Sequence, residues 1–251
     1  MNFTFGIISS INSEVYLDEV IKSIQNQKIV NYEILIIGDN KNNFTQNNIK
    51  QIPFNESEKK GWITKKKNTI TSEAQYENIV FMHDYLKLED NWYQGFLKYG
   101  SDFEVCMNKI ITLDNQRYRD WTLWPLNNNK FDQYLDRTKR CLLPYENNNL
   151  SKYMYISGAY WVAKKKFMLK YPLNEKLLWG EGEDVEWSKK IRKKIDFKLN
   201  VHSSVKLLKE KDPIFQNLDL LTLKMITDYE NKISIKLKDK SKIYIKKALK
   251  K

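Results

Sequence analysis

The stretch Glu33-Ile-Leu-Ile-Ile-Gly-Asp39 is an apolar run that ends in an acidic residue. A second stretch, Asn78-Ile-Val-Phe-Met-His-Asp84, has the same form. A strand covered on both faces is apolar along its whole length, so both stretches predict buried parallel strands. In open α/β sheets, ligands bind beyond the carboxyl ends of the strands. We therefore expect Asp39 and Asp84 to point toward one crevice.

Strand and helix patterns alternate around these two stretches, which indicates an α/β fold. Residues 3–9 predict a strand, and the apolar spacing over residues 15–24 predicts a helix capped by Asn12 or Ser13. Further on we expect helices over residues 62–74, 183–194 and 214–229, and strands over 153–163 and 197–202.

Two segments depart from this alternation. Residues 114–150 are aromatic and rich in Asn, and they predict a long surface excursion rather than a core element. Residues 231–251 hold nine lysines and one aspartate between apolar positions. This tail is either a solvated basic segment or a contact for an anionic membrane face. We expect a catalytic domain over residues 1–205 and a C-terminal helical, lysine-rich extension over residues 206–251.

The composition narrows the class of protein. The 251 residues are 41% hydrophobic, so the chain can bury one core. The net charge of +12 favours binding to an anionic partner. That partner could be nucleic acid, an anionic membrane or a phosphorylated small molecule. Cys106 and Cys141 lack metal-ligand spacing, which favours a reducing compartment. Without a basic leader or an apolar span, we expect a cytoplasmic protein that is soluble or peripheral at the inner face of the membrane.

Three segments then occur in an order that is typical of one enzyme family. The first comprises Ser9-Ser-Ile-Asn12, Tyr16-Leu17, Ser23-Ile-Gln-Asn-Gln27 and the run to Asp39. The second comprises Lys67-Asn68, Ala74, Glu77 and Ile79-Val-Phe-Met-His-Asp-Tyr85. The third comprises Gly158, Pro172-Leu-Asn-Glu175, Glu183-Asp-Val-Glu-Trp187 and Arg192. Over residues 3–202 the chain resembles family-2-like glycosyltransferases of the bacterial surface-polysaccharide type.

The resemblance implies a GT-A fold, with a Rossmann-like, mixed, mainly parallel sheet flanked by helices. It also implies an inverting transfer of a sugar from a nucleotide-diphosphate sugar to a hydroxyl of a glycan or lipid-linked acceptor, as in capsule synthesis. Such a reaction must neutralise a leaving diphosphate and deprotonate the acceptor hydroxyl. By resemblance, Asp184 is the catalytic base, and Glu183 positions it or contacts the acceptor. The helix dipole at the start of the predicted helix favours ionised Asp184, although acids are also ordinary helix-starting residues.

The donor side of the site is implied in the same way. The expected donor-binding residues are Ser10, Asp39, Lys67, Asn68 and Asp84. A divalent metal, Mn or Mg, is expected at Asp84 and at His202, which should end the strand over 197–202; imidazole is an acceptable ligand for manganese. The chain departs from the family pattern because His83 and Tyr85 stand where acids are usual.

On the donor side the chain departs from the family pattern at further positions, and several of these residues have two possible roles. Gly38 replaces the acid that usually precedes Asp39, and Lys67-Asn68 replaces an Arg-Asn pair. Lys67 can serve a diphosphate as a point charge or belong to a solvated face in the run Lys65-Lys-Lys67. His83 and His202 can be ligands or packed residues, and Asp39 can be an acidic turn residue.

The acceptor is expected to bind at Trp179 and Glu181, beside the proposed base. Trp161 lies inside a predicted strand and is expected in the core, whereas Trp121 and Trp124 could either pack or contact substrate. Two other functions compete with the transferase. One is a catalytically inactive sugar- or nucleotide-binding relative, which the reduced motif around Asp84 makes plausible. The other is a basic nucleic-acid-binding protein, for which the sequence has charge but no recognised motif.

Overall fold

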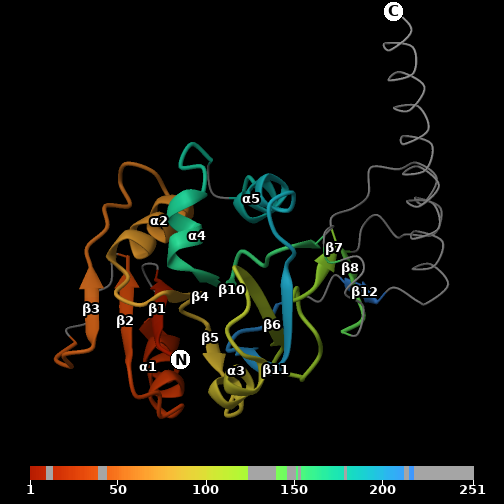
Figure 1. Cartoon of the computed structure of the whole chain (residues 1–251). Helices are drawn as coiled ribbons and strands as arrows, with labels where there is room; N and C mark the ends of the chain where they lie inside the picture. Colours follow the sequence, from red (N-terminus) through yellow and green to blue (C-terminus); the bar gives the residue numbers. More distant parts are fainter. Residues whose placement is uncertain are drawn as a thin grey trace, which may run out of the picture.

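The computed structural model describes residues 1–9, 14–38, 44–123, 140–145, 151, 154–177, 180–211 and 215–217. An eight-stranded sheet, in the order β3-β2-β1-β4-β10-β6-β11-β5, forms its centre (Figure 1). Its strands are β1 (Phe3–Ile8), β2 (Tyr32–Ile37), β3 (Ile49–Ile52), β4 (Asn78–His83), β5 (Leu86–Leu88), β6 (Val105–Ile111), β10 (Tyr160–Lys164) and β11 (Lys198–Leu207). The helices are α1 (Glu14–Gln25), α2 (Ile63–Glu73), α3 (Trp92–Tyr99), α4 (Lys165–Lys170) and α5 (Glu183–Ile191).

The sheet is mixed and mainly parallel, as the sequence predicts. Strands β3, β2, β1 and β4 run parallel, and β11 runs parallel to β6. Strand β10 is antiparallel to both β4 and β6, and β5 is antiparallel to β11. The continuously apolar stretches form β2 and β4, whose last residues lie level with the end of β1. Gly38 and Asp84, which follow these strands, therefore lie at one edge of the sheet.

Helices cover both faces of the sheet. Phe3 and Phe5 on β1 stack against Trp92 of α3, with ring centroids 5.0 and 5.4 Å apart. Gly6, whose pleat points the other way, meets α2: a Cβ at Gly6 would come within 2.4 Å of Ile70. Because side chains alternate across a strand, α2 and α3 lie on opposite faces. Figure 1 shows α4 and α5 on the α2 side and α1 on the α3 side.

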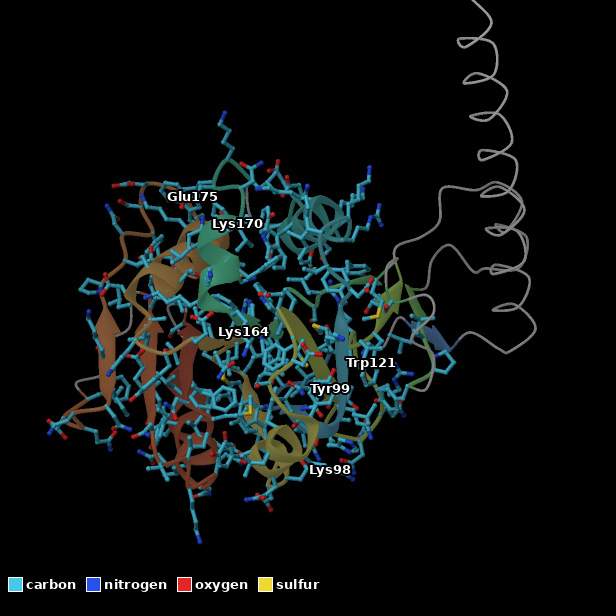
Figure 2. The ribbon with its side chains drawn as sticks, in the orientation of Figure 1. Lys98, Tyr99, Trp121, Lys164, Lys170 and Glu175 are labelled. Carbon is cyan, nitrogen blue, oxygen red and sulfur yellow. The ribbon has the colours of Figure 1, made fainter. Side chains whose placement is uncertain are left out.

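A second, four-stranded sheet adjoins the first, in the order β12-β8-β7-β9. Its strands are β7 (Thr122–Leu123), β8 (Arg140–Leu142), β9 (Met154–Tyr155) and β12 (Phe215–Asn217). The expectation that residues 114–150 are a surface excursion holds for the exposed residues 114–116 but is wrong for residues 120–122 and 142–143, which are buried. Trp121 and Leu143 are fully buried, and the Leu143 N–H donates to the Trp121 carbonyl. Trp121 therefore packs inside the molecule (Figure 2).

Several element boundaries differ from the sequence prediction. The strand expected over residues 153–163 is two strands, β9 and β10, separated by a turn at Gly158. The strand expected to end at His202 continues to Leu207, and Phe215–Asn217, expected to be helical, forms β12. For β9 and β10, and for Phe215–Asn217, the outcome was determined by pairing with a strand that lies far away in the sequence. The cap at residues 12–13 and the tail at 231–251 lie outside the described residues.

Among the described helices, none combines the length and the apolar character needed to cross a bilayer.

A buried chain of side chains connects α3 to the middle of the sheet. Trp92 Nε1 donates to Tyr160 Oη over 2.7 Å, and Tyr160 Oη donates to Asn108 Oδ1 over 2.5 Å. All three residues are fully buried. A buried polar atom left without its partner carries the full cost of desolvation, so this chain stabilises the packing of α3.

We predict that Tyr160→Phe lowers the free energy of unfolding by about 1–3 kcal/mol, because it leaves Trp92 Nε1 and Asn108 Oδ1 without their partner. Urea denaturation measures the change. Tyr93→Phe is the matched control, since the Tyr93 hydroxyl makes only long contacts of 3.4 and 3.5 Å to Met1. Equal losses in the two variants would contradict a special role for the buried chain.

Candidate active site

The beginning of α5 places Asp184 in the interior. Gly182 precedes the helix with φ of 71°, a left-handed conformation that favours glycine. Asp184 is only 5% exposed. Its Oδ2 accepts hydrogen bonds from Gly158 N at 2.9 Å and Arg119 Nη2 at 3.1 Å, and its Oδ1 accepts one from Val185 N at 2.8 Å. The carboxylate is therefore held in one orientation.

Gly158 connects α5 to α2 through its backbone. Its N–H donates to Asp184, and its carbonyl accepts a hydrogen bond from Lys67 Nζ at 2.9 Å. A Cβ at Gly158 would lie 2.9 Å from Glu183 Oε1 and 3.0 Å from Asp184 Oδ2. Such distances are shorter than ordinary van der Waals contacts, so any side chain at this turn would require the two carboxylates to shift.

Lys67 is fully buried on the inner face of α2, which excludes a solvated position for it. Its Nζ lies 3.2 Å from Glu183 Oε1 and 4.3 Å from the centroid of the Trp161 ring. Trp161 is itself fully buried, as expected for a core residue. Burial lowers the pKa of Lys67, and the charges of Glu183 and Asp184 oppose that shift. Lys67 thus fixes both Gly158 and Glu183.

Asn68, the next residue, faces a different partner. Its Nδ2 donates to the Leu173 carbonyl at 3.0 Å and to Glu175 Oε1 at 2.9 Å, and its Oδ1 accepts from Leu173 N at 3.0 Å. Glu175 lies at the end of the molecule where α2 and α4 are found (Figure 2). The structure therefore brings Asn68 to the loop after α4, and not to Asp184.

The pKa values of the two adjacent acids are shifted in opposite directions. Burial raises the pKa of Asp184 and the charge of Glu183 adds to this, while Arg119 and Lys67 oppose it. Burial also acts to raise the pKa of Glu183, but the charge and hydrogen bond of Lys67, together with a backbone hydrogen bond, outweigh it and the pKa of Glu183 is lowered. The helix dipole was expected to favour ionised Asp184; burial is the larger influence and acts the other way. Neighbouring acids whose pKa values are pushed apart are typical of acid-base chemistry.

Arg119 is a site residue that the sequence analysis missed. Its guanidinium pairs with Asp184, while its Nε is buried without a hydrogen-bond partner among the described residues. Its backbone φ is 33°, a conformation that non-glycine residues rarely adopt. Such strain persists where the surrounding structure enforces it, often at functional sites. Arg119 lies in an irregular segment without a motif, so no local signal pointed to it.

The end of β4 lies beside this group. Asp84 is 3% exposed, and its N–H donates to the Ile8 carbonyl at 3.3 Å. The N–H of His83 donates to the Ala159 carbonyl at 3.0 Å, next to Gly158. Burial, followed by the charge of Lys67, lowers the pKa of His83 to about 3, so its imidazole is neutral near pH 7. Asp84 and Asp184 are therefore brought to the same edge of the sheet.

The end of β11 adds two lysines that the sequence analysis did not single out. The N–H of Leu208 donates to the Tyr85 carbonyl at 2.9 Å, which fastens the chain to the residue after Asp84. Lys209 Nζ then lies 3.8 Å, and Lys211 Nζ 5.0 Å, from the centroid of the Tyr85 ring. Burial lowers the pKa of Lys211, and the charges of Lys209 and Arg119 lower it further.

His202 lies elsewhere. Its carbonyl accepts a hydrogen bond from Asn91 Nδ2 at 3.1 Å, beside the first turn of α3. It precedes Leu207 by five residues of strand, roughly 15 Å along β11. The structure thus does not bring His202 to Asp84. Within the described ranges no three His, Cys, Asp or Glu side chains gather as a metal site would require. The described residues therefore do not bring together the two expected metal ligands, Asp84 and His202.

The remaining candidates are not part of this group. Ser10, Asp39, Trp124 and Trp179 lie outside the described residues. Glu181 is exposed just before α5. Gly38, which replaces a family acid, approaches the first loop so closely that a Cβ would lie 2.3 Å from the Ser9 carbonyl oxygen. This contact explains why no side chain stands at that position.

The mixed, mainly parallel sheet with helices on both faces, and a buried acid pair at the carboxyl edge of its parallel strands, is the arrangement of the GT-A fold. The family model described as "Glycosyl transferase family 2" matches residues 7–151, more than half of the sequence. The chain therefore belongs to glycosyl transferase family 2. This confirms the expected enzyme class at the level of the family. No curated protein sequence matches the chain.

Solved structures with the same fold include two glycosyltransferases. A structure of S. aureus TarS 1-349 shares 14% identity and a TM-score of 0.55, covering 81% of this chain and 60% of its own. GalNAc-T7, solved with UDP, GalNAc and Mn2+, shares 15% identity and a TM-score of 0.60, covering 86% of this chain and 45% of its own. Another TarS 1-349 structure, at 14% identity and a TM-score of 0.54, contains UDP-GlcNAc. The chain spans less than two thirds of each of these proteins.

We predict that Lys67→Met lowers the free energy of unfolding by about 3 kcal/mol, because it leaves Glu183 partly buried without its counter-charge. Lys65→Met, two residues earlier on α2, is the matched control. The Lys65 ammonium lies 4.2 Å from the Trp62 ring centroid, and its loss should lower the free energy of unfolding by less than about 1 kcal/mol. Urea denaturation of both variants makes the comparison. Similar small losses would place Lys67 on a solvated face after all.

Proposed function

We propose that the chain transfers a sugar from a nucleoside diphosphate sugar to a hydroxyl group of a glycan or lipid-linked acceptor, with inversion at the anomeric carbon. The observation that carries this proposal is the fixed, buried carboxylate of Asp184, held by Gly158 and Arg119 with a raised pKa. A carboxylate with a raised pKa is a stronger base than an ordinary aspartate, which suits it to accept the proton of a hydroxyl nucleophile.

The hydrogen bonds suggest which oxygen takes the proton. A carboxylate oxygen has two acceptor positions. Oδ2 already accepts from Gly158 and Arg119, whereas Oδ1 accepts only from Val185 among the described groups. We therefore assign the base function to Asp184 Oδ1. Glu183 stays ionised through Lys67 and keeps the Gly158 turn in position.

The other expected residues take proposed roles consistent with their positions. Asp84 remains a donor contact, because it lies at the strand edge beside this group. The contacts of Lys67 and Asn68 support positioning of Gly158 and of the loop at Leu173 rather than direct donor binding. Ser10 and Asp39 for the donor, and Trp179 and Glu181 for the acceptor, are retained as proposals.

Uridine nucleotides are the first donors to test, since TarS is solved with UDP-GlcNAc and GalNAc-T7 with UDP. We place the reaction in surface-polysaccharide synthesis at the inner face of the membrane. The net charge of +12 supports contact with an anionic surface, the lysines of the C-terminal segment being the proposed anchor. We carry forward no metal bridging Asp84 and His202, because the structure separates these residues.

We predict that a panel of UDP, GDP and CDP sugars contains at least one donor that raises the melting temperature and is turned over to nucleoside diphosphate. Asp184→Asn should retain donor binding and lose about 100- to 10,000-fold in turnover. Asp114→Asn, at an exposed position, is the control and should behave like the wild type. Donor binding without turnover by the wild type would identify an inactive relative. No binding of any nucleotide would contradict the transferase itself.

The pKa of Asp184 predicts the pH dependence of transfer. Only the ionised base accepts a proton, so kcat/KM should rise with pH through a pKa above the ordinary aspartate value of about 3.9. Arg119 lowers that pKa, since a positive charge favours the carboxylate. Arg119→Gln should therefore shift the acidic limb to higher pH. A limb that stays in place, or moves to lower pH, would argue against Asp184 as the base.

A further inference from the structure

Four cationic side chains surround the edge where β4 ends. Lys67 and Arg119 are each committed to a carboxylate, Glu183 and Asp184 respectively. Lys209 and Lys211 form no ion pair with a carboxylate of the described residues, yet both are half-buried against Tyr85. The fold thus places two further ammonium groups at this edge, where Asp84 is a third carboxylate beside the acid pair.

The two lysines are held there by the fold. Strand β11 pairs with β5 through Leu207 and Leu86, and the next N–H donates to the Tyr85 carbonyl. The chain that follows must therefore pass beside the residue after Asp84. Burial lowers the pKa of Lys211, and repulsion from the like charges of Lys209 and Arg119 lowers it further. A bound anion would relieve that repulsion.

From this arrangement, and resting on the proposed transferase function, we propose that Lys209 and Lys211 bind the diphosphate of the donor and neutralise it as it leaves, in place of a divalent metal. Lysine ammoniums are effective point-charge partners for phosphate oxygens.

The chemical step balances without a further co-reactant. The acceptor hydroxyl gives its proton to Asp184 Oδ1, and its oxygen forms a bond to the anomeric carbon. The bond between that carbon and the diphosphate oxygen breaks, and its electron pair stays on the departing oxygen. The negative charge that develops there is the charge that the ammonium groups of Lys209 and Lys211 stabilise.

The same residues disfavour a divalent cation. The two positions flanking Asp84 carry His83 and Tyr85, both half-buried, rather than acids. Lys209 stands over the Tyr85 ring at 3.8 Å, so a metal beside Asp84 would lie close to a like charge. Repulsion between like charges is strong in a partly buried site.

The test compares Lys209→Met, Lys211→Met and the double variant with Lys206→Met. Lys206 is the matched control because it lies at the end of β11, just before the two lysines, and donates to Asn115 Oδ1 at 2.9 Å. Calorimetry measures the affinity for UDP and for uridine in EDTA and in MnCl₂, and turnover of the best donor is measured in both. If another nucleotide is preferred in the donor panel, its diphosphate and nucleoside are used.

We expect EDTA to leave wild-type UDP affinity and turnover unchanged within about twofold. Each single variant should weaken UDP binding roughly tenfold, the value of one charge-assisted hydrogen bond, without changing uridine binding. Lys206→Met should bind UDP like the wild type. Circular dichroism confirms that each variant is folded, and retained uridine binding shows that the nucleoside pocket is intact.

Two results overturn the inference. Turnover that EDTA abolishes and Mn²⁺ restores, with normal UDP binding by the double variant, assigns the diphosphate to a metal and leaves the proposed transferase standing. A wild-type protein that binds no nucleotide at all overturns the inference and the proposed function together. UDP binding that depends on the lysines, in a protein without turnover, supports the diphosphate site and contradicts only the transfer.

Discussion

The site depends on the two hydrogen bonds that the backbone of Gly158 makes. Its carbonyl is held by Lys67 from α2, and its N–H is held by Asp184 from α5. The peptide groups on either side of one residue therefore join two helices that lie far apart in sequence. A Cβ there would lie 2.9 Å from Glu183 Oε1 and 3.0 Å from Asp184 Oδ2, so a larger residue would displace the carboxylates from their present positions. The absence of a side chain at this position lets both acids lie close to the turn.

The frame of the fold could be predicted because its signal is local. Continuous apolar runs predicted β2 and β4 and the edge at which Asp84 lies, since a strand buried on both faces must be apolar. The turn at Gly158 could not be predicted in the same way, because the apolar residues on both sides of it read as one strand. The role of Trp121 stayed open and Phe215–Asn217 was predicted to be helical, because strands in the second sheet take their partners from distant segments.

In the site, too, the residues with a local sequence signal could be predicted and those placed by distant segments could not. Glu183 and Asp184 were identifiable as acids at a helix start within a family motif, and the structure brings them together with Lys67 and near Asp84. Arg119 was not identifiable, since it reaches Asp184 from an irregular segment through a strained backbone. Lys209 was hidden because β11 continues five residues beyond His202, and only the pairing with β5 determines where that strand ends.

The positive charge of Arg119 acts on both the proposed base, Asp184, and the proposed diphosphate-binding residue Lys211. It lowers the pKa of Asp184, which weakens the base, and it lowers the pKa of Lys211, which makes the free cationic edge less favourable. A diphosphate bound by Lys209 and Lys211 would offset positive charge at both places. The pKa of Asp184 would then rise when the donor is bound, so the base would gain proton affinity only in the complex that can react. Because these charged groups are partly buried at one edge of the sheet, donor binding would activate the acceptor base through electrostatics, without a conformational change.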